Sequence, residues 1–246
     1  MKTTSSKILL TTIMTSIMVL LQISPAMAIV KPSNADACTH ITTLQSTNEA
    51  EMATHIAIMQ TNFATRLAKI TTDQAAVDQK VATARVNAHN QFEEKIKSME
   101  SQTGLTDTQK QAIETYKTDM NQAETTRETA IDKARTTYRT NLSNSALANQ
   151  RTLTNAVNVY KTAVQSAFAT ASTNCGDGTA LTTLKASIKT ARETLTTTRT
   201  ATKTTNEIKQ YTTTRNDAIK AANKVFTDSV AQYTTTLTSA LKRIPR

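Results

Sequence analysis

Glycine, proline and cysteine are scarce in this sequence, whose 246 residues include three glycines, three prolines and two cysteines. Tryptophan is absent, and aromatic residues make up only 4% of the chain. No proline interrupts residues 33–244, so nothing in this range forces a helix to end. Long helices are therefore expected. Glycine-rich loops that hold phosphate groups are excluded, because three scattered glycines cannot build them.

The sequence also lacks the common motifs of catalysis and metal binding. No G-x-S-x-G, C-x-x-C, P-loop or dinucleotide-binding motif occurs. No two of His40, His55 and His89 have ligand spacing on one helix face. Glu51 and His55 lie four residues apart, but together they offer only two ligands. We expect no enzymatic activity and no catalytic, metal-binding or cofactor-binding residue.

The first 28 residues have the pattern of a secretory signal peptide. Lys2 and Lys7 precede an apolar run at residues 8–23, and an A-x-A cleavage motif follows at residues 26–28. The run is short for a helix that spans a bilayer, and threonines dilute it. We predict cleavage after Ala28, with an uncleaved anchor as the alternative. The mature chain is then secreted or otherwise extracytoplasmic, without a transmembrane segment.

Threonine accounts for about one residue in five, whereas Leu, Ile, Val and Phe together make up just under one-fifth. With a net charge of +10, this composition makes disorder an alternative to a folded structure. The apolar residues are periodic, however, which favours a fold with a thin, alanine-rich core. Because threonine is a poor helix former, packing has to hold the helices together.

Two segments, residues 38–102 and 107–173, carry apolar residues at every third or fourth position. An average step near 3.6 keeps these residues on one face of a straight helix. Gly104 is expected to cap the first helix, and Thr106 and Gln109 have the spacing of a capping box for the second. Two such segments joined by a short turn predict an antiparallel hairpin, with each helix about 100 Å long.

A second turn, after the second segment, contains Gly176 and Gly178. Gly176 is expected to cap the preceding helix in the left-handed conformation. An antiparallel hairpin brings Cys38 close to Cys175, and two cysteines of an exported chain commonly form a disulfide. We predict a Cys38–Cys175 bridge, with unpaired thiols or an intermolecular bridge as the alternatives.

The third segment, residues 179–243, has an apolar pattern that changes part-way. The apolar residues of 181–195 share one face and those of 208–241 another, and the two faces differ by about a third of a turn. A kink or loop is expected within 196–207. The predicted fold is all-α: a single elongated domain, 38–246, in which three long segments form an antiparallel bundle of coiled-coil type. Residues 29–37 are expected to be a short extended segment.

Positive charge is concentrated in the third segment and the three residues after it, which together (179–246) carry twelve basic and four acidic residues. Outside the cytoplasm such a segment suggests anionic polymers, anionic lipid or an envelope protein as partners. Few aromatic residues are available for base stacking, so sequence-specific binding of nucleic acid is not expected. The alternative is that the basic excess only keeps the protein soluble. The candidate residues for polyanion binding are Lys209, Arg215, Lys220 and Lys224.

Threonines of the third segment follow an eleven-residue repeat, which places them on one face of a helix. This arrangement resembles the threonine ladder of helical, alanine-rich antifreeze proteins, and the resemblance implies ice binding as a further alternative. The ladder residues are Thr179, Thr183, Thr190, Thr194, Thr205, Thr212, Thr227, Thr234 and Thr238, with Ala201, Asn216 and Asn223 in the gaps.

These patterns favour a secreted, non-enzymatic helical rod that acts as a structural or interaction protein at the cell envelope or in the extracellular space. Its basic third segment would bind polyanions. The alternative is an extracytoplasmic holdase or a lipid-surface-binding protein that opens its thin core. The methionines of the first segment would suit such adaptable apolar contacts.

Overall fold

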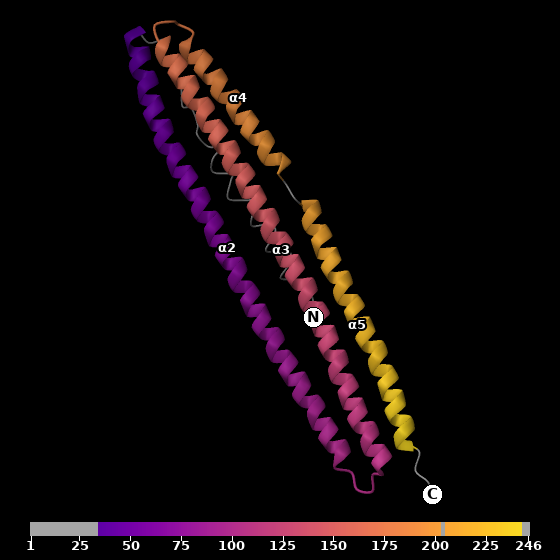
Figure 1. Cartoon of the computed structure of the whole chain (residues 1–246). Helices are drawn as coiled ribbons and strands as arrows, with labels where there is room; N and C mark the ends of the chain where they lie inside the picture. Colours follow the sequence, from indigo (N-terminus) through magenta and orange to yellow (C-terminus); the bar gives the residue numbers. More distant parts are fainter. Residues whose placement is uncertain (1–33, 203–204, 243–246) are drawn as a thin grey trace. The chain divides into compact units, whose positions relative to one another are not determined.

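The computed structural model describes residues 34–202 and 205–242. The predicted signal peptide and residues 29–33, 203–204 and 243–246 lie outside the described part of the chain. Helices account for 94% of what is described, and no strand occurs there, so the all-α prediction is confirmed. The helices are α2 (Asn34–Glu100), α3 (Asp107–Thr173), α4 (Ala180–Ala201) and α5 (Thr205–Lys242) (Figure 1).

The start of α2 differs from the sequence prediction. The helix begins at Asn34, so the expectation that residues 34–37 are extended is wrong. Asp36 lies in the first turn, where its negative charge interacts favourably with the positive end of the helix dipole. Ala37 is buried, which gives this first turn an apolar contact as well. At its other end α2 stops within two residues of the predicted position, and α3 has the predicted bounds.

The turn between α2 and α3 has the left-handed glycine and the capping box that its residues suggest. Gly104 has a φ of 83°, the conformation that ends a helix at low steric cost when the residue is glycine. The Gln109 backbone N–H donates to Thr106 Oγ1 at 3.3 Å, and the Thr106 N–H donates to Gln109 Oε1 at 2.9 Å. Gln109 also donates through Nε2 to the carbonyl of Leu241 in α5, at 3.0 Å.

The turn between α3 and α4 closes in a different way. Within the described chain only the glycine of the first turn has a positive φ, so the expectation that Gly176 adopts the left-handed conformation is wrong. Gly178 does not adopt it either. Asp177 organises the turn instead, because its side chain accepts the N–H of Thr179 and its carbonyl accepts the N–H of Ala180, both at 3.0 Å.

The third segment consists of two helices, since α4 ends at Ala201 and α5 begins at Thr205. The break lies within the predicted interval 196–207, but it is shorter than expected. Towards the end of α4, threonine hydroxyls donate to the carbonyl four residues earlier, a contact that weakens and bends helices. The residues that do so are Thr190, Thr194, Thr196, Thr197, Thr198 and Thr200.

The contacts divide the chain into two units. Unit 1 contains the described residues 34–76 and 149–202, and α4 runs beside the C-terminal part of α3 (Figure 1). Ile41 and Leu184 are almost completely buried at its centre. Around them lies one continuous apolar cluster. Its other buried members are Met52, Tyr160, Val164, Ala167, Phe168, Ala171, Ala180 and Ala191.

Unit 2 contains residues 77–148 and 205–242 of the described chain. Its apolar core is much smaller, with only Ile96, Ile113 and Leu237 buried together. Half-buried Phe92, Met99, Leu105, Ala112, Tyr116 and Leu241 pack around these three. The core of unit 2 therefore involves the C-terminal end of α2, the N-terminal end of α3 and the C-terminal end of α5.

The middle parts of α2 and α3 have no fully buried residue: among the described residues, none at 53–95 or at 114–156 is buried. The predicted apolar row of the first segment is exposed at Val77, Ala84 and Ala88. These residues therefore do not form a buried seam between the helices. Polar contacts take their place in unit 2.

Candidate functional site

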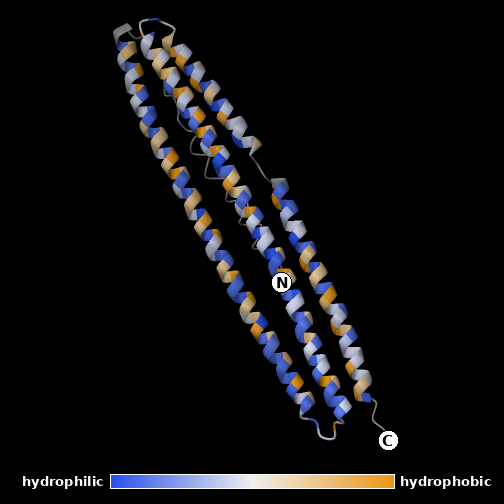
Figure 2. Cartoon of the chain, in the orientation of Figure 1, coloured by the Kyte–Doolittle hydropathy of each residue, from blue (hydrophilic) through white to orange (hydrophobic). Residues whose placement is uncertain are grey.

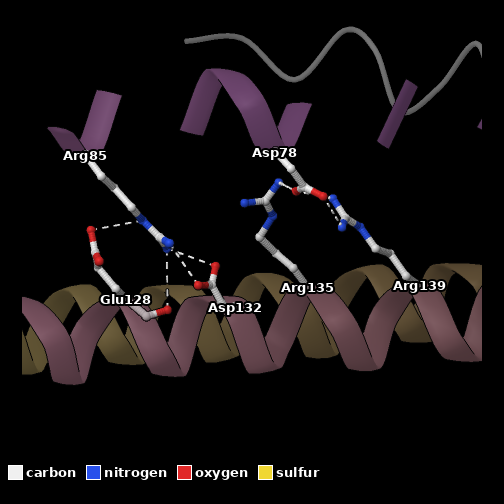
Figure 3. A network of polar contacts seen from close by, with 6 residues as sticks. All are labelled: Asp78, Arg85, Glu128, Asp132, Arg135 and Arg139. Atoms are coloured by element: carbon white, nitrogen blue, oxygen red, sulfur yellow. Dashed lines mark hydrogen bonds and ion pairs between the residues drawn. The ribbon is translucent and has the colours of Figure 1, made fainter. Parts of the chain in front are cut away.

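A network of ion pairs joins α2 to α3 in unit 2 (Figure 3). Arg85 of α2 holds Asp132 of α3 through two parallel hydrogen bonds, Nη1 to Oδ2 at 2.8 Å and Nη2 to Oδ1 at 2.9 Å. Its Nε lies 2.9 Å from Oε1 of Glu128. A guanidinium with two bonds to one carboxylate is a strong and geometrically specific ion pair. It lowers the pKa of Asp132.

Asp78 of α2 forms the second part of the network, with two arginines of α3 (Figure 3). Arg139 donates to both carboxylate oxygens at 2.7 Å, and Arg135 donates to Oδ1 at 2.8 Å. The hydrogen bonds from Arg139, followed by its charge and that of Arg135, lower the pKa of Asp78. One carboxylate is therefore bound by two positive charges and stays ionised at neutral pH.

The ion pairs continue along the same helices. Glu93 lies 3.1 Å from Lys117, whose hydrogen bond lowers the pKa of Glu93, and His89 lies 3.8 Å from Glu124. As residue numbers rise along α2, those of the partners fall along α3, the pairing order of antiparallel helices. Sequence reasoning missed these contacts, because it followed apolar periodicity and not the charges beside it.

The four residues predicted to bind polyanions lie on α5, but they have different environments. Arg215 is half-buried, with its guanidinium 4.3 Å from the centre of the Tyr138 ring. Lys224 pairs with Asp228 at 2.7 Å. Lys209 and Lys220 are exposed, and neither makes an ion pair with a described residue. Only two of the four ammonium or guanidinium groups are therefore unengaged.

These four residues also do not share one face of α5. At 100° per residue, Lys209, Lys220 and Lys224 lie within an arc of about 60°, whereas Arg215 lies at least about 120° away. The four candidate residues therefore do not form one basic face. The contact of Arg215 with Tyr138 of α3 is a separate feature, which the sequence of α5 alone does not reveal. Two acidic residues lie at the edge of the same arc: Asp217 and Asp228.

A more continuous basic stripe occurs on α4, in unit 1. Lys185, Lys189, Arg192 and Arg199 lie within an arc of about 80°. The only acidic residue of α4 is Glu193, which lies 3.8 Å from Lys189 in an exposed pair. Sequence reasoning counted these residues in the basic third segment but did not single them out. Their spacing of four, three and seven residues was the available signal.

The two cysteines lie together in unit 1. The Cα atoms of Cys38 and Cys175 are 4.9 Å apart, and the residues are joined as a disulfide that closes a separation of 137 residues. Cys175 packs against the apolar core of the unit. The cysteine pair expected from the hairpin register is therefore present in the structure, next to Gly176 and Gly178 in the second turn.

Other kinds of site have little support. Within the ranges described, no group of three or more His, Cys, Asp or Glu residues is placed to hold a metal ion. A groove of about 360 Å³ lies between α3 and α5 in unit 2, lined by Tyr116, Asp119 and Tyr233 among others, and it is open to solvent. No described helix is long and apolar enough to cross a membrane, and hydrophilic residues interrupt every helix (Figure 2).

The threonine ladder is divided between two helices, because the break after Ala201 separates its α4 part from its α5 part. Several ladder hydroxyls, such as those of Thr190, Thr212 and Thr227, donate to carbonyls of their own helix. No protein-family model, curated protein or solved structure is significantly similar to this chain.

Proposed function

We propose that the mature chain is a non-enzymatic helical interaction protein of the cell envelope or extracellular space, which binds an anionic partner through its basic third segment. The observation that carries the proposal is the balance of charge: α4 and α5 carry nine basic and four acidic residues, whereas α2 and α3 carry fourteen of each. Arg85, Arg135 and Arg139 on α2 and α3 pair with acidic residues across the helices. The exposed Lys185 and Lys209 of α4 and α5 form no ion pair in the described structure.

An exposed lysine without a neighbouring carboxylate keeps its full attraction for external anions. Several such lysines act together on a polymer, because each contact releases counterions and adds to the affinity. Paired arginines contribute much less, since their partners already neutralise them. The third segment is therefore the part of the chain best suited to bind a polyanion.

The cysteine pair and the sequence signal support a location outside the cytoplasm, because disulfides form and persist there. Mass spectrometry of protein secreted by its source cell should find a mature chain that begins at Ile29, directly after the predicted cleavage site. A chain that retains residues 1–28 would contradict the signal peptide.

We further propose that the helices form one elongated antiparallel bundle. With 67 residues each, α2 and α3 are about 100 Å long, and both inter-helix turns are short. Small-angle scattering should therefore show an extended particle. A radius of gyration near 17–18 Å, the value for a globular protein of this length, would contradict the bundle.

Binding tests the proposed function directly. The oxidised mature protein should bind an immobilised sulfated polysaccharide at low salt, and its affinity should fall steeply as salt rises from about 50 to 200 mM. A neutral polysaccharide of the same length is the control. Equal binding of both polymers, or no binding at 50 mM salt, would contradict the proposal.

One observation favours the second candidate, a holdase-like protein. The middle parts of α2 and α3 have no fully buried residue within the described ranges, and Met59 and Met120 are half-buried there. These parts would expose apolar surface at low cost if the helices separated. Suppression of aggregation of a reduced, unfolding client at equimolar ratio, together with a broad unfolding transition, would support this candidate over the first.

A further inference from the structure

We infer that the basic stripe of α4, formed by Lys185, Lys189, Arg192 and Arg199, is the binding site for a linear anionic polysaccharide. This inference rests on the proposed function and locates it on α4, in unit 1, instead of on the four predicted residues of α5. It is carried by the arrangement of charge on α4, by the residues between the charges and by the packing of the adjoining apolar face of the helix.

The charges of α4 are aligned along the helix. From Lys185 to Arg199 the stripe spans fifteen residues, or about 21 Å along the axis, and it stays within an arc of about 80°. A row of four positive side chains is better suited to bind a single extended polymer than to bind a flat anionic surface. On α5 two acidic residues, Asp217 and Asp228, lie at the edge of the corresponding row and weaken its field.

The basic side chains of α4 are also accessible to a ligand. Lys185 and Lys189 are exposed, and the pair that Lys189 makes with Glu193 leaves both side chains more than 60% exposed, at 76% and 66%. Exposed pairs of this kind contribute little and yield readily to a competing anion. Arg192 already has an interaction inside the protein, so its role is to add to the field. Arg199 is half-buried, which holds its stem in place.

The residues between the charges favour a sugar polymer. Thr196 lies on the stripe between Arg192 and Arg199, with Thr200 beside it. Their hydroxyls donate to carbonyls of α4, which leaves the hydroxyl oxygens able to accept hydrogen bonds from sugar hydroxyls. No aromatic residue occurs in α4, so the stripe lacks the platforms on which nucleic acid bases stack.

The apolar face of α4, which adjoins the basic stripe, argues against a lipid surface. Leu184, Ile188 and Leu195 belong to or pack against the apolar core of unit 1. A helix that binds a bilayer interface inserts its apolar face between the lipids, and here that face is already used inside the protein. The stripe can therefore attract a ligand only through its charge, and this attraction acts on an anionic polymer that lies along the stripe.

The test compares two variants of the full mature, oxidised protein that lose the same charge. The first is Lys185→Gln, Lys189→Gln and Arg199→Gln on α4, and the second is Lys209→Gln, Lys220→Gln and Lys224→Gln on α5. The probe is a heparin decasaccharide, titrated at several salt concentrations. The α4 variant should bind at least about tenfold more weakly at 50 mM salt. Its affinity should also depend less steeply on salt, because a variant that has lost three charged contacts releases fewer counterions when it binds. The α5 variant should change less than threefold.

Each outcome separates the inference from the proposed function. If both variants lose affinity equally, or the α5 variant loses more, the α4 site is wrong while polyanion binding stands. If the unmodified protein does not bind heparin at 50 mM salt, the proposed function fails. Tighter binding of an oligothymidylate of equal charge, or of vesicles containing phosphatidylglycerol, overturns the assignment to a polysaccharide.

Folding of the α4 variant is checked by circular dichroism and by the intact disulfide. If that variant unfolds, Lys185→Gln with Lys189→Gln replaces it, because both side chains are exposed and the half-buried Arg199 is left in place. This double variant should still lose about fivefold in affinity at 50 mM salt, a smaller loss in proportion to two counterion-releasing contacts instead of three. An unchanged affinity would overturn the inference.

Discussion

Unit 1 and unit 2 are built from parts of the same two long helices, yet they are held together by different forces. In unit 1 an apolar cluster of ten buried residues lies beside a disulfide. In unit 2 only three residues are buried together, and arginines pair with carboxylates between α2 and α3. The comparison shows that one helical pattern can continue while the contacts that hold it change. Apolar packing dominates in unit 1, and ion pairs between α2 and α3 take its place in unit 2.

The largest expected effect is loss of packing in unit 1. Leu184 is 1% exposed within the large cluster, so Leu184→Ala should lower the free energy of unfolding by about 2–5 kcal/mol, since it leaves a cavity. Leu237→Ala in unit 2 removes the same atoms from a smaller cluster that collapses more easily, and should cost less. Denaturant unfolding of both variants measures the difference. Equal losses would show that the two cores are equally rigid.

Removal of the disulfide should have the next largest effect. Replacing both Cys38 and Cys175 by serine should cost about 2–4 kcal/mol, because the unfolded chain gains conformational freedom. Amide exchange should accelerate in α4 and around residues 34–44, which belong to unit 1, and stay unchanged around Arg85. Non-reducing peptide mapping of protein from an oxidising compartment is the prior check, and free thiols there would contradict the bridge.

The two turns differ in their need for glycine. Gly104→Ala should cost about 1–2 kcal/mol, because the φ of 83° is strained for any residue with a Cβ atom. Gly176→Ala should change stability by less than about 0.5 kcal/mol, since its φ is not positive and nothing lies within 4 Å of the added Cβ. Thermal unfolding of the two variants compares them directly. A larger loss for Gly176→Ala would contradict the geometry of the second turn.

The ion pairs of unit 2 should produce the smallest effect, and one that depends on pH. The pKa values of Asp78, Asp132 and Glu93 are all lowered by their partners. A lowered acid pKa stabilises the fold at pH values above the normal pKa, and this stabilisation is lost as pH falls through the folded-state value. Amide protection in unit 2 should therefore decline below about pH 4, while that of the apolar core of unit 1 persists.

A single substitution sharpens the same point. The Asp78 side chain is 48% exposed, so solvent screens its pairs and Asp78→Asn should cost no more than about 0.5–1 kcal/mol at neutral pH. The variant should also lose part of the acid sensitivity of unit 2. Asp73→Asn is the matched control in unit 1, because among the described residues Asp73 pairs only with Lys69 of its own helix. Equal effects of the two substitutions would contradict the role of the network.

Local patterns determined the helical elements. The bounds of α3, the capping box of Thr106 and Gln109, and the interval of the break in the third segment followed from residues close together in the chain. The early start of α2 was missed, although Asp36 in its first turn was a visible signal. The cysteine pair followed from counting along the hairpin, because two antiparallel helices of known length have a fixed register.

Tertiary structure decided which side chains are engaged and which remain available. Arg215 was grouped with the lysines of α5 by sequence, but its position over Tyr138 depends on α3. The pairs of Asp78 with Arg135 and Arg139 link residues about sixty positions apart, and apolar periodicity does not report them. The physical reason is that a helix is defined by neighbours along its own backbone. The charge that it offers to a partner depends on the side chains packed against it from other helices.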